Sequence, residues 1–207
     1  MAGTHQNLGR RVVKIFINGK RADNQYALAD AVGATVRRVD QAARRAAVST
    51  SRKASPLAKV LITAAYSIKP SKLTDKVKTR MDGQTLHVDA STRRFALIDF
   101  AGKWAGRRSI GATASILVGQ MKTYAGAFIA TIQGLRSIRV RKAKGGKRVA
   151  RGPVQIVRGR STFQMITGRD ADGNIVDNHG IADKLKAQLI AFYVTEVRRL
   201  YKVAGRS

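Results

Sequence analysis

Apolar residues recur at steps of three and four in two stretches of the chain, and this period predicts helices at its two ends. We expect helices over 26–67, the first of them from about 24 to 51. Ser55-Pro56 restarts a second helix, because proline suits a first helical turn. A last amphipathic helix is predicted over 181–203. The stripe of the first helix comprises Ala29, Val32, Val36, Val39, Ala43 and Ala46, and that of the last Ala182, Leu185, Leu189, Tyr193, Val197 and Leu200.

The stripe of the first helix is narrow and built from small side chains, and two interpretations stay open. In the first, the helix lies on the surface and docks this face on the core. In the second, the small side chains permit close packing against a neighbouring subunit. Asp40 is expected to pair with Arg44 one turn later.

Between 77 and 166 the pattern changes to short β-prone runs separated by glycines. These runs predict one curved, mostly antiparallel sheet with a long basic loop: Thr85–Val88, Phe95–Phe100, Ser115–Lys122, Ala127–Ile132, Ser137–Lys142 and Val154–Val157. A further run, Val12–Ile17, ends at the turn signal Asn18-Gly19. The fold class is therefore α+β, with an N-terminal extension over 1–25 and a single domain over 26–203.

Charge changes this picture most. The 207 residues contain 40 Lys and Arg against 12 Asp and Glu, a formal net charge of +28. A folded body with this excess repels itself, so we expect a polyanionic or acidic partner. The chain has no cysteine, which fits assembly in a reducing cytoplasm. No stretch is long and apolar enough to predict a membrane span or a signal peptide.

The cations are densest where acids are missing. From Phe100 to Arg169 there is no acidic residue, whereas fifteen Lys or Arg occur. We expect a basic hairpin loop that contacts a phosphate backbone or an acidic protein surface, and the charge alone leaves both open. Strand alternation would place Arg139 and Arg141 on the same face. The contact candidates are Arg136, Arg139, Arg141, Lys142, Lys144, Lys147, Arg148 and Arg151.

Catalytic patterns are not found. His87 and Asp89 share a strand face but are typical of a surface pair. The run Asp170–Asn174 begins like a calcium loop, yet Ile175 and Ile181 stand where that loop needs glycine and an acid, so an Asp-Gly hairpin turn is the better interpretation. Trp104 lies among basic residues and is a candidate for a cation–π contact. We therefore predict no enzyme activity, no cofactor and no metal site.

Three ordered segments resemble a known family. The run Leu97-Ile98-Asp99-Phe100-Ala101-Gly102-Lys103-Trp104 is followed by Gly126-Ala127-Phe128-Ile129-Ala130-Thr131-Ile132, and later by Gly152-Pro153-Val154-Gln155-Ile156-Val157-Arg158-Gly159-Arg160-Ser161. In this order they resemble the lambda-type phage minor tail protein Z family, the tail completion proteins. The likeness covers roughly residues 26–200.

The resemblance implies a structural virion protein at the head-proximal end of the tail. Its subunits would form a ring, hexameric to match a tail tube, and join the tube to the neck. Its partners would be further copies, other tail and neck proteins and genomic DNA. The motif residues are expected to pack rather than to contact partners, and Asp99 is expected to pair with an arginine. These residues are Leu97, Ile98, Asp99, Phe100, Gly126, Ala127 and Phe128. The alternative is a free basic nucleic-acid-binding protein of ribosomal or nucleoid type.

Overall fold

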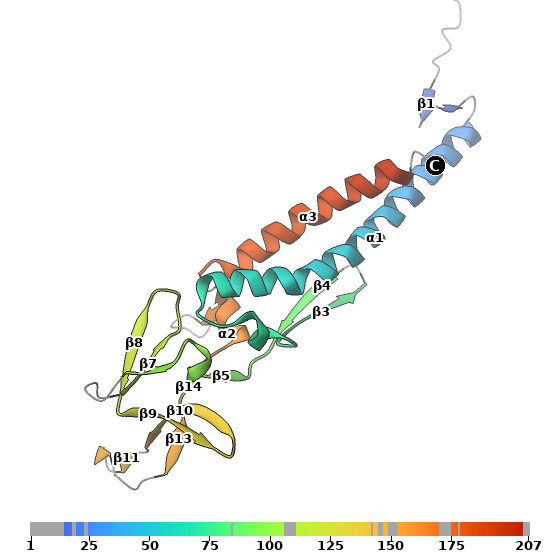
Figure 1. Ribbon diagram of the computed structural model, residues 1–207. Coiled ribbons are helices and arrows are strands. Elements are labelled where there is room, and N and C mark those ends of the chain that lie inside the picture. The colour runs from blue at the N-terminus through green and yellow to red at the C-terminus, as the bar shows by residue number, and fades with distance from the viewer. Residues whose placement is uncertain are drawn as a thin grey trace, which may run out of the picture. The chain divides into compact units, whose positions relative to one another are not determined.

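The computed structural model describes residues 15–17, 20–22, 25–83, 85–105, 111–141, 143–144, 147–148, 153–169, 175–177 and 179–204. The fold is α+β, as predicted, with a long helix, several small antiparallel sheets and a second long helix (Figure 1). The chain forms two compact units. Unit 1 comprises 1–46 and 194–207, and unit 2 comprises 47–193. The expected division into 1–25 and 26–203 stays a prediction.

Helix α1 is one continuous helix, Gln25–Ala65, and the prediction of two helices was wrong. Pro56 lies inside it, although proline removes one backbone hydrogen bond and costs about 3 kcal/mol in a helix interior. Packing on either side offsets this cost, because Ala54 and Ala58 are both fully buried. The hydroxyl of Ser55 also donates to the Val77 carbonyl, at 3.0 Å.

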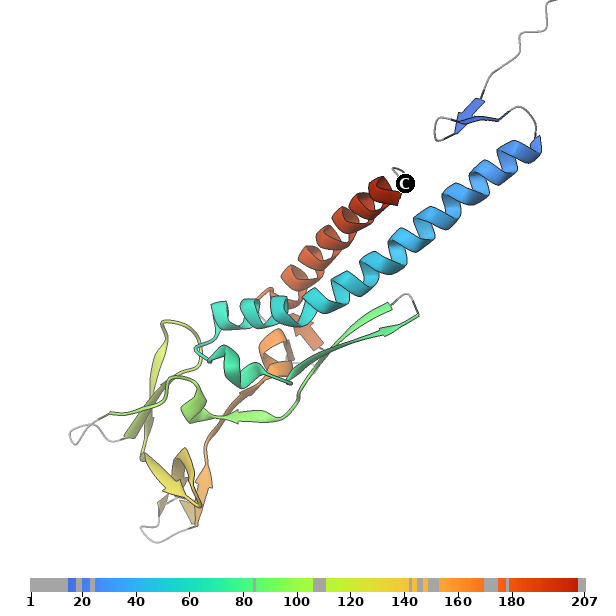
Figure 2. The same cartoon turned by 45° about the vertical axis from the view of Figure 1, so that its right-hand side comes forward.

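In unit 2, the first hydrophobic cluster lies among the second half of α1, the first half of α3 (Ile181–Ala204) and the short helix α2 (Thr162–Ile166). The hairpin β3 (Val77–Asp82) and β4 (Thr85–Ala90) completes it. The helices and the hairpin can be followed in Figures 1 and 2. The buried residues of this cluster include Ile62, Tyr66, Leu73, Phe100, Met165, Leu185 and Leu189. The predicted last helix is confirmed.

The side chains of β4 alternate between the two faces of the hairpin. Leu86, Val88 and Ala90 pack on the first cluster, so the residues between them, His87 and Asp89, face the other way. Asp89 is bonded to Arg80, with 3.2 Å between the guanidinium Nε and Oδ2. The expected pairing of His87 with Asp89 is thus replaced by a cross-strand neighbour.

The second cluster lies in a group of short strands. Sheet β6-β7-β8 comprises Lys103–Trp104, Gly111–Ser115 and Met121–Ala125, and sheet β13-β10-β9 comprises Val154–Ile156, Leu135–Arg141 and Ala127–Ile132. Leu97, Ala112, Ala114, Ala127 and Ile138 are buried together there. The single curved sheet of the prediction is therefore several small sheets.

Two predicted strands are shorter than expected. The run 115–122 is mostly a turn between β7 and β8, because Gly119 has a φ of +78° and the Ser115 hydroxyl donates to the Leu117 carbonyl at 2.6 Å. The run 95–100 is divided between β5 (Arg94–Ala96) and the 3-10 turn η2 (Leu97–Asp99). A second 3-10 turn, η1, spans Pro70–Leu73.

The remaining strands form two-stranded pairs. β14 (Arg158–Ser161) pairs with β5, β15 (Thr167–Arg169) with β16 (Ile175–Asp177), and β11 (Ala143–Lys144) with β12 (Lys147–Arg148). The β15–β16 pairing confirms a hairpin where one was expected, although 170–174 lie outside the described residues. Asp177 accepts the backbone N–H groups of Ala182 and Asp183 at 2.8 and 3.0 Å and so caps α3.

Unit 1 contains the antiparallel strands β1 (Ile15–Ile17) and β2 (Lys20–Ala22), the first part of α1 and the last part of α3. The strand predicted over 12–17 is present from Ile15, and the remainder and the turn Asn18-Gly19 lie outside the described residues. The predicted pair of Asp40 and Arg44 is confirmed at 2.9 Å. In the described part of the chain, no helix has the length and apolar character of a bilayer span.

Candidate functional site

Strand β10 carries the first of the predicted contact residues. It is the central strand of its sheet and pairs with β9 and β13. Ser137, Ile138 and Arg139 are consecutive and all buried, and because side chains alternate along a strand, both faces of β10 are covered here. Arg136 and Arg141 are exposed at either end of this buried stretch.

Arg139 differs from the expectation of a surface cation. It is 8% exposed, and its Nε donates to the Ser137 hydroxyl at 2.8 Å. A buried guanidinium requires hydrogen-bond partners, since desolvation costs several kcal/mol per ion. Within the subunit Arg139 is thus a structural residue of β10. Arg141 lies two residues later on the same side of the strand, 5.6 Å above the ring of Phe128.

The rest of the basic segment follows β10 directly. Ala143 pairs with Arg148 and Lys144 with Lys147, so the backbone forms a small hairpin. The described part of this segment ends at Arg148, and Lys142 and Arg151 lie outside the described residues. A contact of this segment with DNA or with an acidic protein stays a prediction.

The motif residues of the resemblance come together as packing elements. Leu97 is 1% and Phe100 0% exposed, at the start and end of the same 3-10 turn. Ala127 is buried against Leu97 in the second cluster, whereas Phe100 belongs to the first. Gly126 has a φ of +64° and forms the turn between β8 and β9. The two segments therefore support the body of unit 2.

Asp99 is also paired, although with a different residue type from that expected. Its Oδ1 lies 2.9 Å from Nζ of Lys72 in η1, rather than beside an arginine. Ile98, in the same turn, is half-buried and accepts the Gly102 N–H at 3.1 Å. Trp104 is 52% exposed. The cation–π contacts of the described residues involve Phe192, Phe128 and Tyr66 instead.

Tyr66 is the buried titratable group of the first cluster. Its side chain is 0% exposed, and its hydroxyl accepts Nη1 of Arg160 at 3.3 Å. Burial raises the pKa of Tyr66 above its ordinary value, and the charge and hydrogen bond of Arg160 partly oppose that rise. The native state therefore holds this proton more tightly than the unfolded chain does.

We expect alkaline pH to weaken unit 2 through this residue. Between the tyrosine pKa of the unfolded chain, about 10, and the higher native value, the native state binds more protons, so stability falls as pH rises. The melting temperature of Tyr66→Phe should fall less steeply than that of the wild type above about pH 10, measured by circular dichroism. Tyr201→Phe, at a half-buried position of α3, is the matched control. Equal slopes for all three proteins would contradict the assignment.

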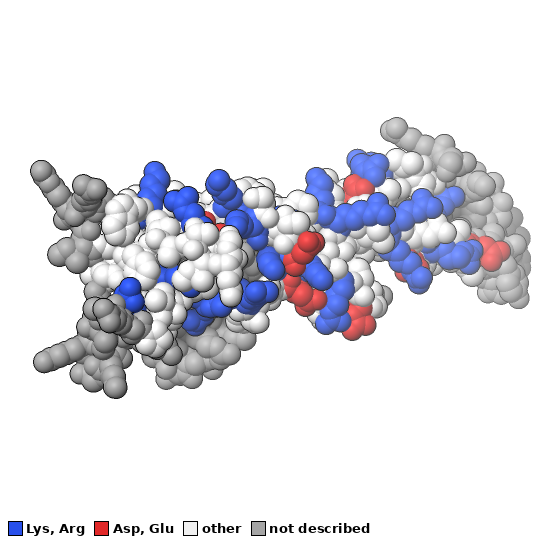
Figure 3. All heavy atoms as spheres, turned by 60° about the horizontal axis from the view of Figure 1, so that its bottom comes forward, with Lys and Arg blue, Asp and Glu red and all other residues white. Residues whose placement is uncertain are grey.

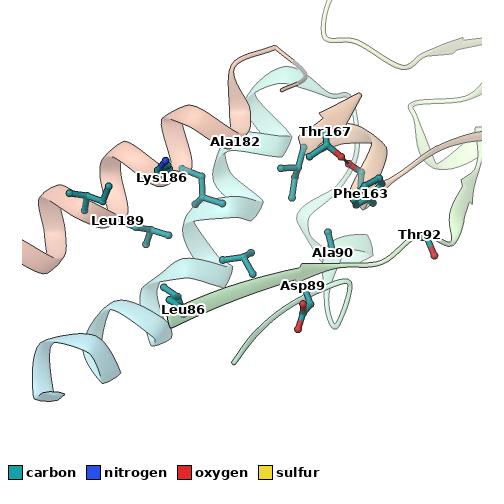
Figure 4. Close-up of a pocket in the computed structure, with 13 residues that line it drawn as sticks. Leu86, Asp89, Ala90, Thr92, Phe163, Thr167, Ala182, Lys186 and Leu189 are labelled. Carbon is teal, nitrogen blue, oxygen red and sulfur yellow. Dashed lines mark hydrogen bonds between the residues drawn. The ribbon is translucent and has the colours of Figure 1, made fainter. Parts of the chain in front are cut away.

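An apolar hollow of about 770 Å³ lies between the β3–β4 hairpin, α2 and α3. Figure 4 shows that Leu86 and Ala90 face it from β4 and Ala182 and Leu189 from α3, whereas Asp89 points away. The Thr167 hydroxyl donates to the Phe163 carbonyl at 2.9 Å at one end. Sequence reasoning did not find this hollow. Its signal was present in the alternation of 86–90 and in the stripe of the last helix.

The described residues contain many more cationic than acidic side chains. They contain no group of three or more His, Asp or Glu side chains placed to hold a metal ion. Lysine and arginine side chains are instead spread over the face drawn in Figure 3.

Compared with known proteins, the chain matches no protein-family model. No curated protein and no solved structure is significantly similar to it.

Proposed function

We propose that this chain is a structural subunit of a phage tail, a tail completion protein that forms a ring at the head-proximal end and joins the tail tube to the neck. The ordered segments 97–104, 126–132 and 152–161 are the basis of the resemblance. They contribute Phe100 to the first cluster and Leu97 and Ala127 to the second, as packing motifs of one protein family would. Such a subunit acts by assembly with copies of itself and with other tail and neck proteins, in the virion.

The observation that carries the proposal is an exposed apolar row on α1. Val32, Val36 and Val39 are 47%, 61% and 45% exposed, at the spacing of one helix face. Farther along the helix, Ala42 and Ala46 are buried. Exposed valines in a row are costly in water, and a neighbouring subunit would cover them. This favours the second interpretation of the narrow stripe, packing against a second copy.

Charge supports an assembled state as well. A subunit with a net charge of +28 repels its own copies unless a polyanion or acidic partner lies nearby. Ring subunits beside the DNA passage or against acidic tail proteins would meet such a partner. The exposed Arg136 and Arg141 and the hairpin after them are the proposed contact.

The test is the mass of the purified full-length protein by sedimentation equilibrium, at salt concentrations that screen its charge. We expect a closed oligomer, six times the subunit mass of 22.5 kDa. Val36→Asp should shift the protein to monomer, because a carboxylate would be buried in the contact. Val48→Asp is the control, since Val48 is 48% exposed on the same helix but lies about 120° around its axis.

Two results would overturn the proposal. One is a wild-type monomer that binds nucleic acid with a steep salt dependence, which would identify a free nucleic-acid-binding protein. The other is equal dissociation by Val36→Asp and Val48→Asp, which would place the contact away from this row.

A further inference from the structure

A second hollow of unit 2, of about 810 Å³, is lined by arginines and hydroxyl side chains together with the apolar Ile116 and Phe163. Arg94 of β5 and Arg158 and Arg160 of β14 contribute three guanidinium groups. Hydroxyl and small residues complete much of the lining: Thr92, Gly159, Ser161, Thr167 and Gly168. We call this hollow the arginine groove.

Strand pairing brings the three arginines together from distant parts of the chain. β14 pairs antiparallel with β5, with Arg158 opposite Ala96 and Ser161 opposite Arg94, and the register shifts between these pairs. A β-bulge of this kind re-aims side chains. Gly159 faces the core, since a Cβ there would lie 2.4 Å from the Phe100 ring. Its neighbours on either side, Arg158 and Arg160, both line the groove.

The guanidinium groups have only neutral partners among the described residues. Arg160 donates to the Tyr66 hydroxyl and the Gln164 carbonyl at 3.3 and 3.4 Å, and Arg158 donates to the Arg94 carbonyl at 3.5 Å. The ion pairs formed within the described residues do not include them. Asp177 is the acid in the lining, and both of its oxygens accept N–H groups at the start of α3.

We propose that the arginine groove binds phosphate groups of a nucleic-acid backbone. Guanidinium groups present paired donors that match phosphate oxygens, and the exposed Thr92 hydroxyl adds a further donor. Arg160 is already placed for this, because it lies 5.9 Å above the Tyr66 ring and is held by two hydrogen bonds.

Continuity with the basic segment favours nucleic acid over an acidic protein. β13 leads into β14 through Val157, whose N–H and carbonyl bond to Ile138 and Leu97, so the backbone stays extended toward the groove. Arg141 of β10 lies opposite Val154 of β13, and at roughly 3.3 Å per residue the four steps from Val154 to Arg158 span at most about 13 Å. A single phosphate backbone could therefore contact Arg141 and Arg158 together. This inference rests on the proposed function for the presence of DNA beside the subunit.

The experiment measures binding of the full-length protein to a fluorescent duplex of mixed sequence, by anisotropy, over a range of salt concentrations. Arg94→Gln/Arg158→Gln leaves Arg160 and its contacts in place. If two phosphate contacts are lost, the slope of log affinity against log salt should fall by about 1.8, and affinity at 0.1 M salt by about one to two orders of magnitude. Arg52→Gln/Arg198→Gln removes the same charge at exposed helix positions and should keep the slope.

A second double variant separates the effect of positive charge from that of the paired guanidinium donors, and it is a milder change to the fold. Arg94→Lys/Arg158→Lys keeps the charge but loses the paired donors, so it should bind more weakly than the wild type with an unchanged slope. Equal slopes and affinities for the groove and control pairs would overturn the inference. So would competition by polyglutamate as effective as that by duplex DNA at equal charge. The oligomer mass is measured separately, so failure here differs from failure of the ring proposal.

Discussion

Phe100→Ala is expected to lower the free energy of unfolding by about 3–5 kcal/mol. Phe100 is fully buried, and its ring meets that of Phe95 edge to face, with 6.2 Å between centroids and 85° between planes. The substitution would leave a cavity between β5, β14 and the first cluster, where surrounding side chains already fill the space. Urea denaturation followed by far-ultraviolet circular dichroism measures the loss.

Trp104→Ala is the matched control for this truncation. Trp104 is also a large aromatic residue, but 52% of it is exposed, so its removal should change the free energy of unfolding by only about 0.5 kcal/mol. Similar losses for the two variants would show that Phe100 does not support the core. They would also contradict the packing role inferred for the segment 97–100.

Gly159→Ala is expected to destabilise the protein by about 1–3 kcal/mol, because the added methyl group overpacks a filled core. Its Cβ would lie 2.4 and 2.8 Å from two carbons of the Phe100 ring, and that ring has no room to move. Gly33→Ala is the control, since a Cβ there meets only the end of the Arg37 side chain at 3.7 Å. In a helix interior this change should instead stabilise by about 0.5–1 kcal/mol.

A double-mutant cycle tests the contact itself. With Phe100→Ala in place, Gly159→Ala should cost little, because the methyl group enters the space that the ring occupied. The coupling energy between the two positions should then exceed about 1 kcal/mol. Additive losses would mean that the backbone at Gly159, and not the ring of Phe100, requires glycine.

The sequence predicted those elements whose pattern is local. The stripe over 181–203 and the run 127–132 match α3 and β9 closely, because each buries one continuous face or joins a regular sheet. The break expected at Pro56 did not occur, since Ala54 and Ala58 pack on the core and hold the helix together. The run 115–122 was misassigned because its turn depends on a hydrogen bond from Ser115.

The candidate site was predicted in part. The density of cations after Leu135 located the exposed Arg136 and Arg141, but periodicity could not show that both faces of β10 are covered and that Arg139 is buried. Arg94 and Arg158 are 64 positions apart, and only the pairing of β5 with β14 joins them. The one local sign was the alternation of Arg158 and Arg160 around a glycine.

The turn η2 connects the two hydrophobic clusters of unit 2. Leu97 and Phe100 stand at its two ends and belong to different hydrophobic clusters. Unfolding of either cluster should therefore displace the backbone turn that also holds a residue of the other cluster. Amide protons deep in β10 and in α2 should accordingly exchange with deuterium through one common opening, so that the strands and helices of unit 2 behave as a single foldon.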